Sequence, residues 1–335
     1  MNPLLKYIVK RLALLPFQIW LIFSIVFLLM RAIPVNPARA ILGEGASEEA
    51  VLAYEKFLGL DKPIYVQYIQ QLNMLIHGNL GVSYQTLLPV WHSIANHFPI
   101  TVEVALGGMA IALLIGWPLG AIAAAKKGTL LDHIGRIYGG LLASMPVFWL
   151  GLMFQLAFLG KLPIQGIASA WNVFPHVTGF ALIDSFLWGG LPSLIDVLEH
   201  YFLPWLTLGL IYSGIHSRFL RANMERTLNE EYIKYAKVRG LDWWKGIIFN
   251  HAFKNSIIPV VALVALHLAT LLGGALITET VFNIPGMGLR LFIGIYSDDY
   301  PIVQGFMVFI GIIIVLTATI ADIIIAIVDP RVRYT

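Results

Sequence analysis

The side chains of this sequence that could do chemistry do not form any catalytic pattern. Its 335 residues include no cysteine, so disulfides, thiolate metal sites and cysteine nucleophiles are excluded. Neither the nucleotide-binding pattern G-x-x-x-x-G-K-[ST] nor the zinc-protease pattern H-E-x-x-H occurs. The ionisable residues inside the long apolar runs are few and scattered: Glu103, His216, His267 and Asp322. A membrane-embedded enzyme would need a paired acid and base or a nucleophile among them, so the sequence does not favour catalysis.

The charges that do cluster are basic. Eight of the 22 Lys and Arg residues lie between Arg218 and Lys254, in a segment with a hydrophobic run on either side. Periodicity alone allows two interpretations of this segment. One is a solvated helix whose tyrosines and tryptophans lie among lipid headgroups, and the other is a folded platform on which a partner docks.

The composition places most of the chain in lipid. It is 58% hydrophobic and only 12% charged, whereas soluble proteins carry about 25% charged residues. The net charge of +3 is too small to suggest a nucleic-acid partner. About 20 apolar residues cross a bilayer, and such spans must be helical to satisfy their backbone polar groups. Six runs are candidates, the fourth being short but extendable through Leu220: Leu12–Met30, Val102–Ala125, Ile137–Leu159, Tyr201–Ile215, Ile257–Ile277 and Val303–Val328.

The distribution of cations orients these six runs. With the N-terminus inside, 16 of the 22 Lys and Arg residues lie on the inner side, as the positive-inside rule requires. The first run is longer than the apolar core of a signal peptide, so we expect it to be retained. The sequence therefore predicts an all-α membrane protein with six transmembrane helices and both termini inside. Its expected parts are a cytoplasmic N-terminus with the first span (1–31), an extracytoplasmic loop (32–101) and a membrane core (102–335), which holds an extracytoplasmic segment (160–200) and a cytoplasmic loop (218–256).

The basic loop contains signals for two short helices. Thr227 and Glu230 fit a capping box at the start of the first helix. Gly240 follows that helix where a left-handed residue is common, and Asp242 can cap a second helix over Trp243–Lys254. In the first outer segment, a further short helix is expected over Glu48–Leu58.

The loop resembles the EAA loop of ATP-binding-cassette importer permeases, in the version of the dipeptide, oligopeptide and nickel permease family. The resemblance rests on Tyr232–Leu241, on His251–Asn255 and on Pro259. It extends over nearly the whole chain, through segments 58–63, 78–84, 144–151, 279–282, 285–288, 299–301 and 329–333. Two departures stand out: residues 33–37 replace the usual Pro-Gly-Asp-Pro, and the gap from Gly240 to His251 is one residue longer than the family pattern.

The resemblance implies a type I importer permease whose cytoplasmic loop acts as a coupling helix. The residues expected to dock on an ATPase are Glu231, Tyr232, Tyr235, Ala236, Lys237, Arg239, Gly240 and Leu241. The implied partners are two cytoplasmic ATPase subunits, a second homologous permease subunit in a heterodimer, an extracytoplasmic substrate-binding protein and the lipid bilayer. ATP and Mg²⁺ would be bound by the ATPases, and no cofactor is expected in this chain.

The resemblance also implies that this chain forms half of a pathway for di- or oligopeptides in a prokaryotic cell membrane. Nickel chelates and glutathione are the alternative substrates. An ion-coupled secondary transporter is disfavoured, because two related halves are not evident. Candidates for the pathway or its gate are Glu279, Phe282, Pro285, Gly286 and Asp322. Ionisable groups within spans face either a cavity or a helix partner, and both interpretations stay open for Glu103, His267 and Asp322.

Overall fold

The computed structural model describes residues 3–32, 37–43, 45–273 and 275–328, and these are mostly helical. The helices before the first long core helix are α1 (Pro3–Ala32), α2 (Pro37–Leu42), α3 (Glu48–Leu58) and α4 (Ile64–Ile76). The central helices are α5 (Val90–Ala125), α6 (Leu130–Ser144), α7 (Val147–Phe158) and α8 (Ala181–Leu228). The remaining helices are α9 (Glu231–Val238), the π-helix η1 (Trp243–Phe253), α10 (Lys254–Leu272), α11 (Leu276–Val281), α12 (Met287–Tyr296) and α13 (Tyr300–Val328).

Six membrane-crossing units are compatible with these helices. Among the described residues, five helical stretches are long and apolar enough to cross a bilayer, and there are six if the bent pair of α6 and α7 is one span. The helical, six-span fold class is thereby confirmed. The third predicted span, Ile137–Leu159, is divided between α6 and α7, which meet at an angle of 101°. Pro146 explains the break, since proline removes an amide donor and holds the preceding Met145 in an extended conformation.

The helix that contains the fourth span extends beyond the apolar run at both ends. Helix α8 has 48 residues in total and consists of two helices joined by a kink at Gly190, whose backbone is not helical. Hydropathy underestimates it because polar residues interrupt the apolar pattern, yet these face protein rather than lipid. His200, His216 and Ser217 are all buried.

Glycines allow α5 and α8 to pack at close range. A β-carbon at Gly116 would lie 2.7 Å from the carbonyl oxygen of Ser213, and one at Gly120 would lie 2.7 Å from that of Ser217. Close backbone approach through small residues is a common way to pack helices within a membrane. The α5–α8 pair is thus the most extensive helix contact of the structure.

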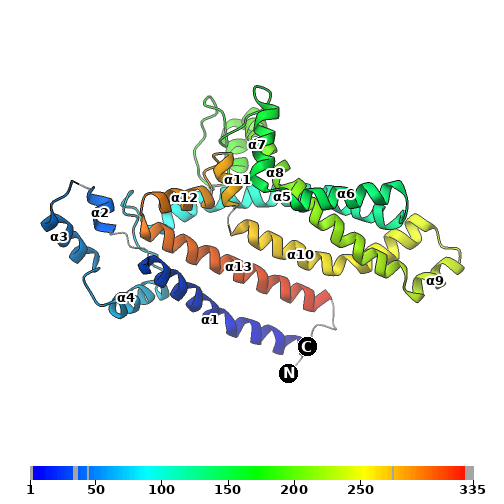
Figure 1. Ribbon diagram of the computed structural model, residues 1–335, viewed down its shortest axis with the longest axis horizontal. Helices are drawn as coiled ribbons and strands as arrows, with labels where there is room; N and C mark the ends of the chain where they lie inside the picture. Colours follow the sequence, from blue (N-terminus) through cyan, green and yellow to red (C-terminus); the bar gives the residue numbers. More distant parts are fainter. Residues whose placement is uncertain (1–2, 33–36, 44, 274, 329–335) are drawn as a thin grey trace.

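Figure 1 shows where the remaining helices lie relative to α5 and α8. Helices α1 and α13 run side by side, and α10 packs against α13 as well as against α5 and α8. Helix α9 lies at one end of the elongated molecule, and α2 to α4 lie toward the other end. Helix α3 has the predicted bounds, with Ser47 capping its start and the left-handed Gly59 at its end.

Candidate functional site

Helix α9 ends where the sequence predicted. Gly240 has a φ of 73°, in the left-handed region. The backbone N–H of Leu241 donates to the carbonyl oxygen of Ala236, and that of Gly240 donates to Lys237. This pair of bonds is the Schellman arrangement, which favours glycine at the left-handed position. It turns the chain sharply into the next helix.

The prediction that a capping box at Thr227 and Glu230 starts α9 was wrong. Helix α8 continues through Leu228, so α9 begins only after Glu230. The Thr227 hydroxyl donates to the carbonyl oxygen of Asn223 and bonds with the Ser256 hydroxyl at 2.9 Å. Thr227 therefore links the end of α8 to α10 and does not cap α9, because it is still part of helix α8.

One face of α9 packs on η1. Ile233 and Ala236 are buried together with Ile247 of η1, and Trp243 covers the same cluster. The ammonium group of Lys237 lies 5.1 Å from the ring centre of Trp243. Ala236, expected at the docking surface, thus points into the protein, where its small side chain lets the two helices approach closely. A hydrogen bond from Asn255 Nδ2 to the Tyr232 hydroxyl, 2.8 Å long, adds a second tie.

The opposite face of α9 is open. Tyr235 is 69% exposed and Val238 is 86% exposed, and Leu241 beyond the turn is 41% exposed. Arg239 is exposed beside them. Apolar and basic side chains therefore share one accessible surface at the end of the molecule. Val238 was not singled out from the sequence, although its spacing from Tyr235 places both on one helical face.

The second helix of the loop has an unexpected geometry. It is a π-helix of 11 residues, Trp243–Phe253, and continues directly into α10. Asp242 caps it as predicted, accepting a hydrogen bond from the Lys245 amide at 2.6 Å. Each π-helical bond spans one more residue than an α-helical bond, so this geometry can take up the extra residue between Gly240 and His251. The Ile247 amide, for example, donates to the carbonyl oxygen of Asp242.

Four of the five gate candidates, Glu279, Phe282, Pro285 and Gly286, lie near the junction of α5, α11 and α12. Glu279 is fully buried and accepts hydrogen bonds from the Thr101 hydroxyl and the Gly288 amide, both at 2.7 Å, and from the Leu289 amide at 3.2 Å. Gly286 leaves room for this carboxylate, because a β-carbon there would lie 2.4 Å from Glu279 Cδ. Thr101, which donates one of these hydrogen bonds, was not suggested by the sequence.

Phe282 and Pro285 flank the same junction. Phe282 is buried, and its ring lies against Gly151 of α7, where a β-carbon would be 3.2 Å away. Pro285 is half-buried, just before the start of α12. The side chain of Asp322 in α13 lies outside the described residues, so its assignment stays a prediction.

Replacing Glu279 with alanine should destabilise this junction. Three donors would lose their acceptor in a buried site, and each unsatisfied group costs about 1–3 kcal/mol. We expect a lower midpoint of thermal unfolding in detergent. Glu230→Ala, which removes an exposed carboxylate, is the control and should leave the midpoint unchanged. Equal unfolding midpoints for both variants would contradict a stabilising role of the hydrogen bonds that Glu279 accepts.

The other ionisable residues within spans bind neighbouring helices. Glu103 accepts hydrogen bonds from the Ala181 and Leu182 amides and from the Tyr201 hydroxyl, so it holds the start of α8 against α5. His267 Nδ1 of α10 lies 3.3 Å from His216 Nε2 of α8. The helix-contact interpretation therefore describes both Glu103 and His267.

Two known protein families match the sequence of this chain. Residues 116–334 match the family described as "Binding-protein-dependent transport system inner membrane component", and residues 4–105 match the corresponding N-terminal family. The chain belongs to this family. The two matches together include the basic loop and the gate junction, and they leave residues 106–115 within α5 between them.

Relatives match this chain over almost its whole length. A probable D,D-dipeptide transport system permease protein of Escherichia coli is 40% identical over 312 residues, which is 92% of each chain. A dipeptide transport system permease protein of Escherichia coli is 34% identical and covers 99% of each. A di/tripeptide transport system permease protein of Pseudomonas aeruginosa is 36% identical and also covers 99% of each.

The matching family and relatives are all transport proteins. The chain is an ATP-binding-cassette importer permease of the dipeptide and oligopeptide family, a transport subunit and not an enzyme. It is a multi-pass protein of a bacterial inner membrane. Such a permease works with further permease, ATPase and substrate-binding components.

Proposed function

We propose that this permease forms half of a translocation pathway for short peptides and is driven through α9 by a separate ATPase. Peptide is the substrate class because the relatives at 34–40% identity are named for dipeptide or di/tripeptide transport. Glutathione is the second candidate, since a glutathione transport system permease protein of Escherichia coli is 30% identical over 335 residues. Glutathione is itself a tripeptide, although its first amide bond runs through the γ-carboxyl group of glutamate, so the two candidates differ in backbone at that bond.

The observation that carries the coupling role is the division of α9 into two faces. Ile233 and Ala236 anchor the helix to η1, so a force on it reaches α10 and the membrane core. Tyr235, Val238 and Arg239 stay accessible for a partner. An aromatic ring beside a cation is typical of the residues that dominate protein interfaces. This favours the docking platform over the headgroup-level helix.

The two ends of the permease face opposite sides of the membrane and meet different partners. The α9 end faces the cytoplasm, with both termini on that side, and the segments 32–101 and 160–200 face outward. The importer then contains two ATPases that bind ATP and Mg²⁺, a second, homologous permease in a heterodimer and an extracytoplasmic binding protein that selects the substrate. Glu279, Phe282, Pro285 and Gly286 form part of the gate near the outward end, and Asp322 is a further candidate for the pathway. The permease core is 102–335.

Uptake into proteoliposomes tests this function. The permease, its partner permease, the ATPases and the binding protein are reconstituted together, and uptake of labelled dipeptides, glutathione and nickel chelates is compared. We expect dipeptide uptake that requires ATP and stops when the ATPases are left out. Uptake driven by an ion gradient without ATP would contradict the proposal, and uptake of glutathione or nickel chelates alone would contradict the peptide assignment.

A further inference from the structure

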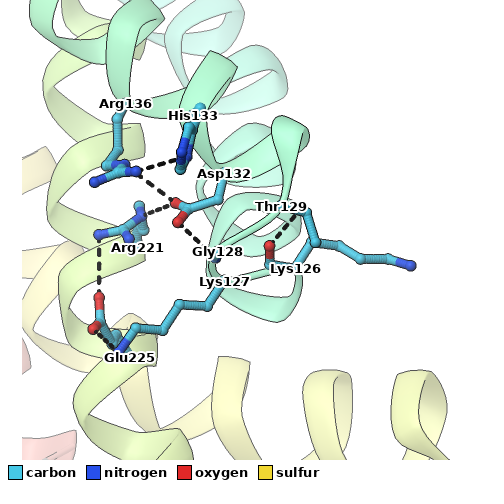
Figure 2. Close-up of polar contacts among 9 residues, drawn as sticks. All are labelled: Lys126, Lys127, Gly128, Thr129, Asp132, His133, Arg136, Arg221 and Glu225. Atoms are coloured by element: carbon cyan, nitrogen blue, oxygen red, sulfur yellow. Dashed lines mark hydrogen bonds and ion pairs between the residues drawn. The ribbon is translucent and has the colours of Figure 1, made fainter.

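An ion-pair network joins the turn between α5 and α6 to the end of α8 that leads into α9 (Figure 2). It consists of Lys127, Asp132, Arg221 and Glu225. Arg221 Nε donates to Asp132 Oδ1 at 2.6 Å, and Arg221 Nη1 lies 3.1 Å from Glu225 Oε2. Lys127 Nζ pairs with the other oxygen of Glu225. One guanidinium group thus bridges two carboxylates on different helices.

Asp132 is the centre of this network. Its side chain is only 2% exposed, and its Oδ2 accepts a hydrogen bond from the Gly128 amide at 3.0 Å. Gly128 has a φ of 80°, so the turn has a conformation that favours glycine at this position. A single buried carboxylate therefore holds the backbone of the α5–α6 turn and the side chain of Arg221. Charge-assisted hydrogen bonds of this kind are short and directional.

The periphery of the network is different. Arg136 lies 3.7 Å from Asp132 Oδ1, is 51% exposed and bonds with His133 through another nitrogen, as Figure 2 shows. Exposed pairs of this kind contribute little, because water screens them and their side chains lose entropy when they are fixed. Arg136 therefore offers a control that changes a cation near Asp132 without removing the bridge.

Contacts other than the network also hold α6 and α8 together. These helices already pack through Gly139 and Gly214, and the Tyr138 hydroxyl bonds with the Ser213 hydroxyl. Replacing a buried ion pair with apolar side chains of similar size is often neutral for stability, whereas charged pairs can fix one register. The additional contribution of Asp132 and Arg221 is therefore to fix the position of α8 relative to the α5–α6 turn.

We infer that Asp132 and Arg221 are positioning residues for transport, which make the α5–α6 turn move together with α8 when the ATPase moves α9. Glu225 is close to the start of α9, so the bridge acts where the movement enters the membrane helices. Without it, α8 could shift against α6, and part of the movement would be lost. This inference rests on the proposed coupling role of α9.

The decisive measurement is the number of peptides transported per ATP hydrolysed by the complete importer in proteoliposomes. The double variant Asp132→Leu/Arg221→Met removes the bridge but keeps apolar packing in its place. We expect this ratio to fall about fivefold or more, the size of an ordinary coupling between sites, with unchanged assembly. Arg136→Gln should keep the native ratio. A native ratio in the assembled double variant overturns the inference.

A distance measurement separates positioning from plain packing. The native chain has no cysteine, so Leu130→Cys and Arg226→Cys, both at exposed positions, can carry a unique pair of spin labels. We expect one narrow distance distribution with and without ATP in the otherwise native chain. In the double variant the distribution should broaden when ATP binds. An equally narrow distribution in both proteins would overturn the inference.

Two further variants keep the outcome unambiguous. If the double variant does not assemble, Arg221→Lys replaces it, because lysine keeps the charge but cannot bridge both carboxylates as a guanidinium does. A native ratio in that variant overturns the inference. Gly240→Val tests the proposed function separately. If Gly240→Val uncouples transport and the bridge variants do not, only the inference fails, whereas native coupling in Gly240→Val removes the basis of both.

Discussion

Replacing Gly240 with valine is expected to uncouple peptide uptake from ATP hydrolysis while the protein still inserts in the membrane. The left-handed conformation of this residue costs a side-chain-bearing residue about 1–2 kcal/mol, and a β-branched side chain more. Valine will therefore open the turn between α9 and η1. Since 1.4 kcal/mol is tenfold in an equilibrium constant, we expect coupled uptake to fall about tenfold or more.

The local structure explains why this effect should be confined to the turn. A β-carbon at Gly240 would have no described atom within 4 Å, so the substitution strains the backbone without a steric clash. Gly240→Asn is the matched control, because asparagine tolerates the left-handed region better than other residues, and it should retain most of the uptake. Uptake and ATP hydrolysis are measured in the same proteoliposomes. Valine and asparagine variants with equal, native coupling would contradict the role of the turn.

Replacing Gly116 with alanine is expected to damage the membrane core itself. Glycine to alanine normally stabilises a helix by about 1 kcal/mol, but here the new β-carbon would lie 2.7 Å from a backbone oxygen and 3.0 Å from the Cα atom of Ser213. No side-chain rotation relieves such a contact, so α5 and α8 must separate. We expect a loss of about 3 kcal/mol of stability, at the upper end for overpacked cores.

Gly140 supplies the matched control for this prediction. It lies within α6, and a β-carbon there would meet no described atom within 4 Å. Gly140→Ala should therefore leave the unfolding midpoint in detergent unchanged or raise it, whereas Gly116→Ala should lower the midpoint and the yield of monodisperse protein. If both variants unfolded alike, the close α5–α8 contact would be wrong.

The sequence determined the features that depend on composition and on local backbone preferences. Apolar length predicted the membrane fold, because lipid demands helices whatever their partners are. The left-handed Gly240, the cap at Asp242 and the helix Glu48–Leu58 also followed from local rules, since each depends on neighbours a few residues away. The clustered cations located the basic loop, and the family resemblance implied its coupling role because the motif is continuous in the chain.

Only the tertiary structure decided which groups meet across the bundle. Thr101 of α5 and Glu279 of α11 are brought together because both helices pack against α12, and Asp132 meets Arg221 through the packing of α6 and α8. The two residues of each pair are far apart in the sequence, so no periodic pattern could predict that they are in contact. The inward direction of Ala236 was undecidable for a similar reason: periodicity defines the faces of a short helix but not which face its neighbour covers. Burial against η1 settled that choice.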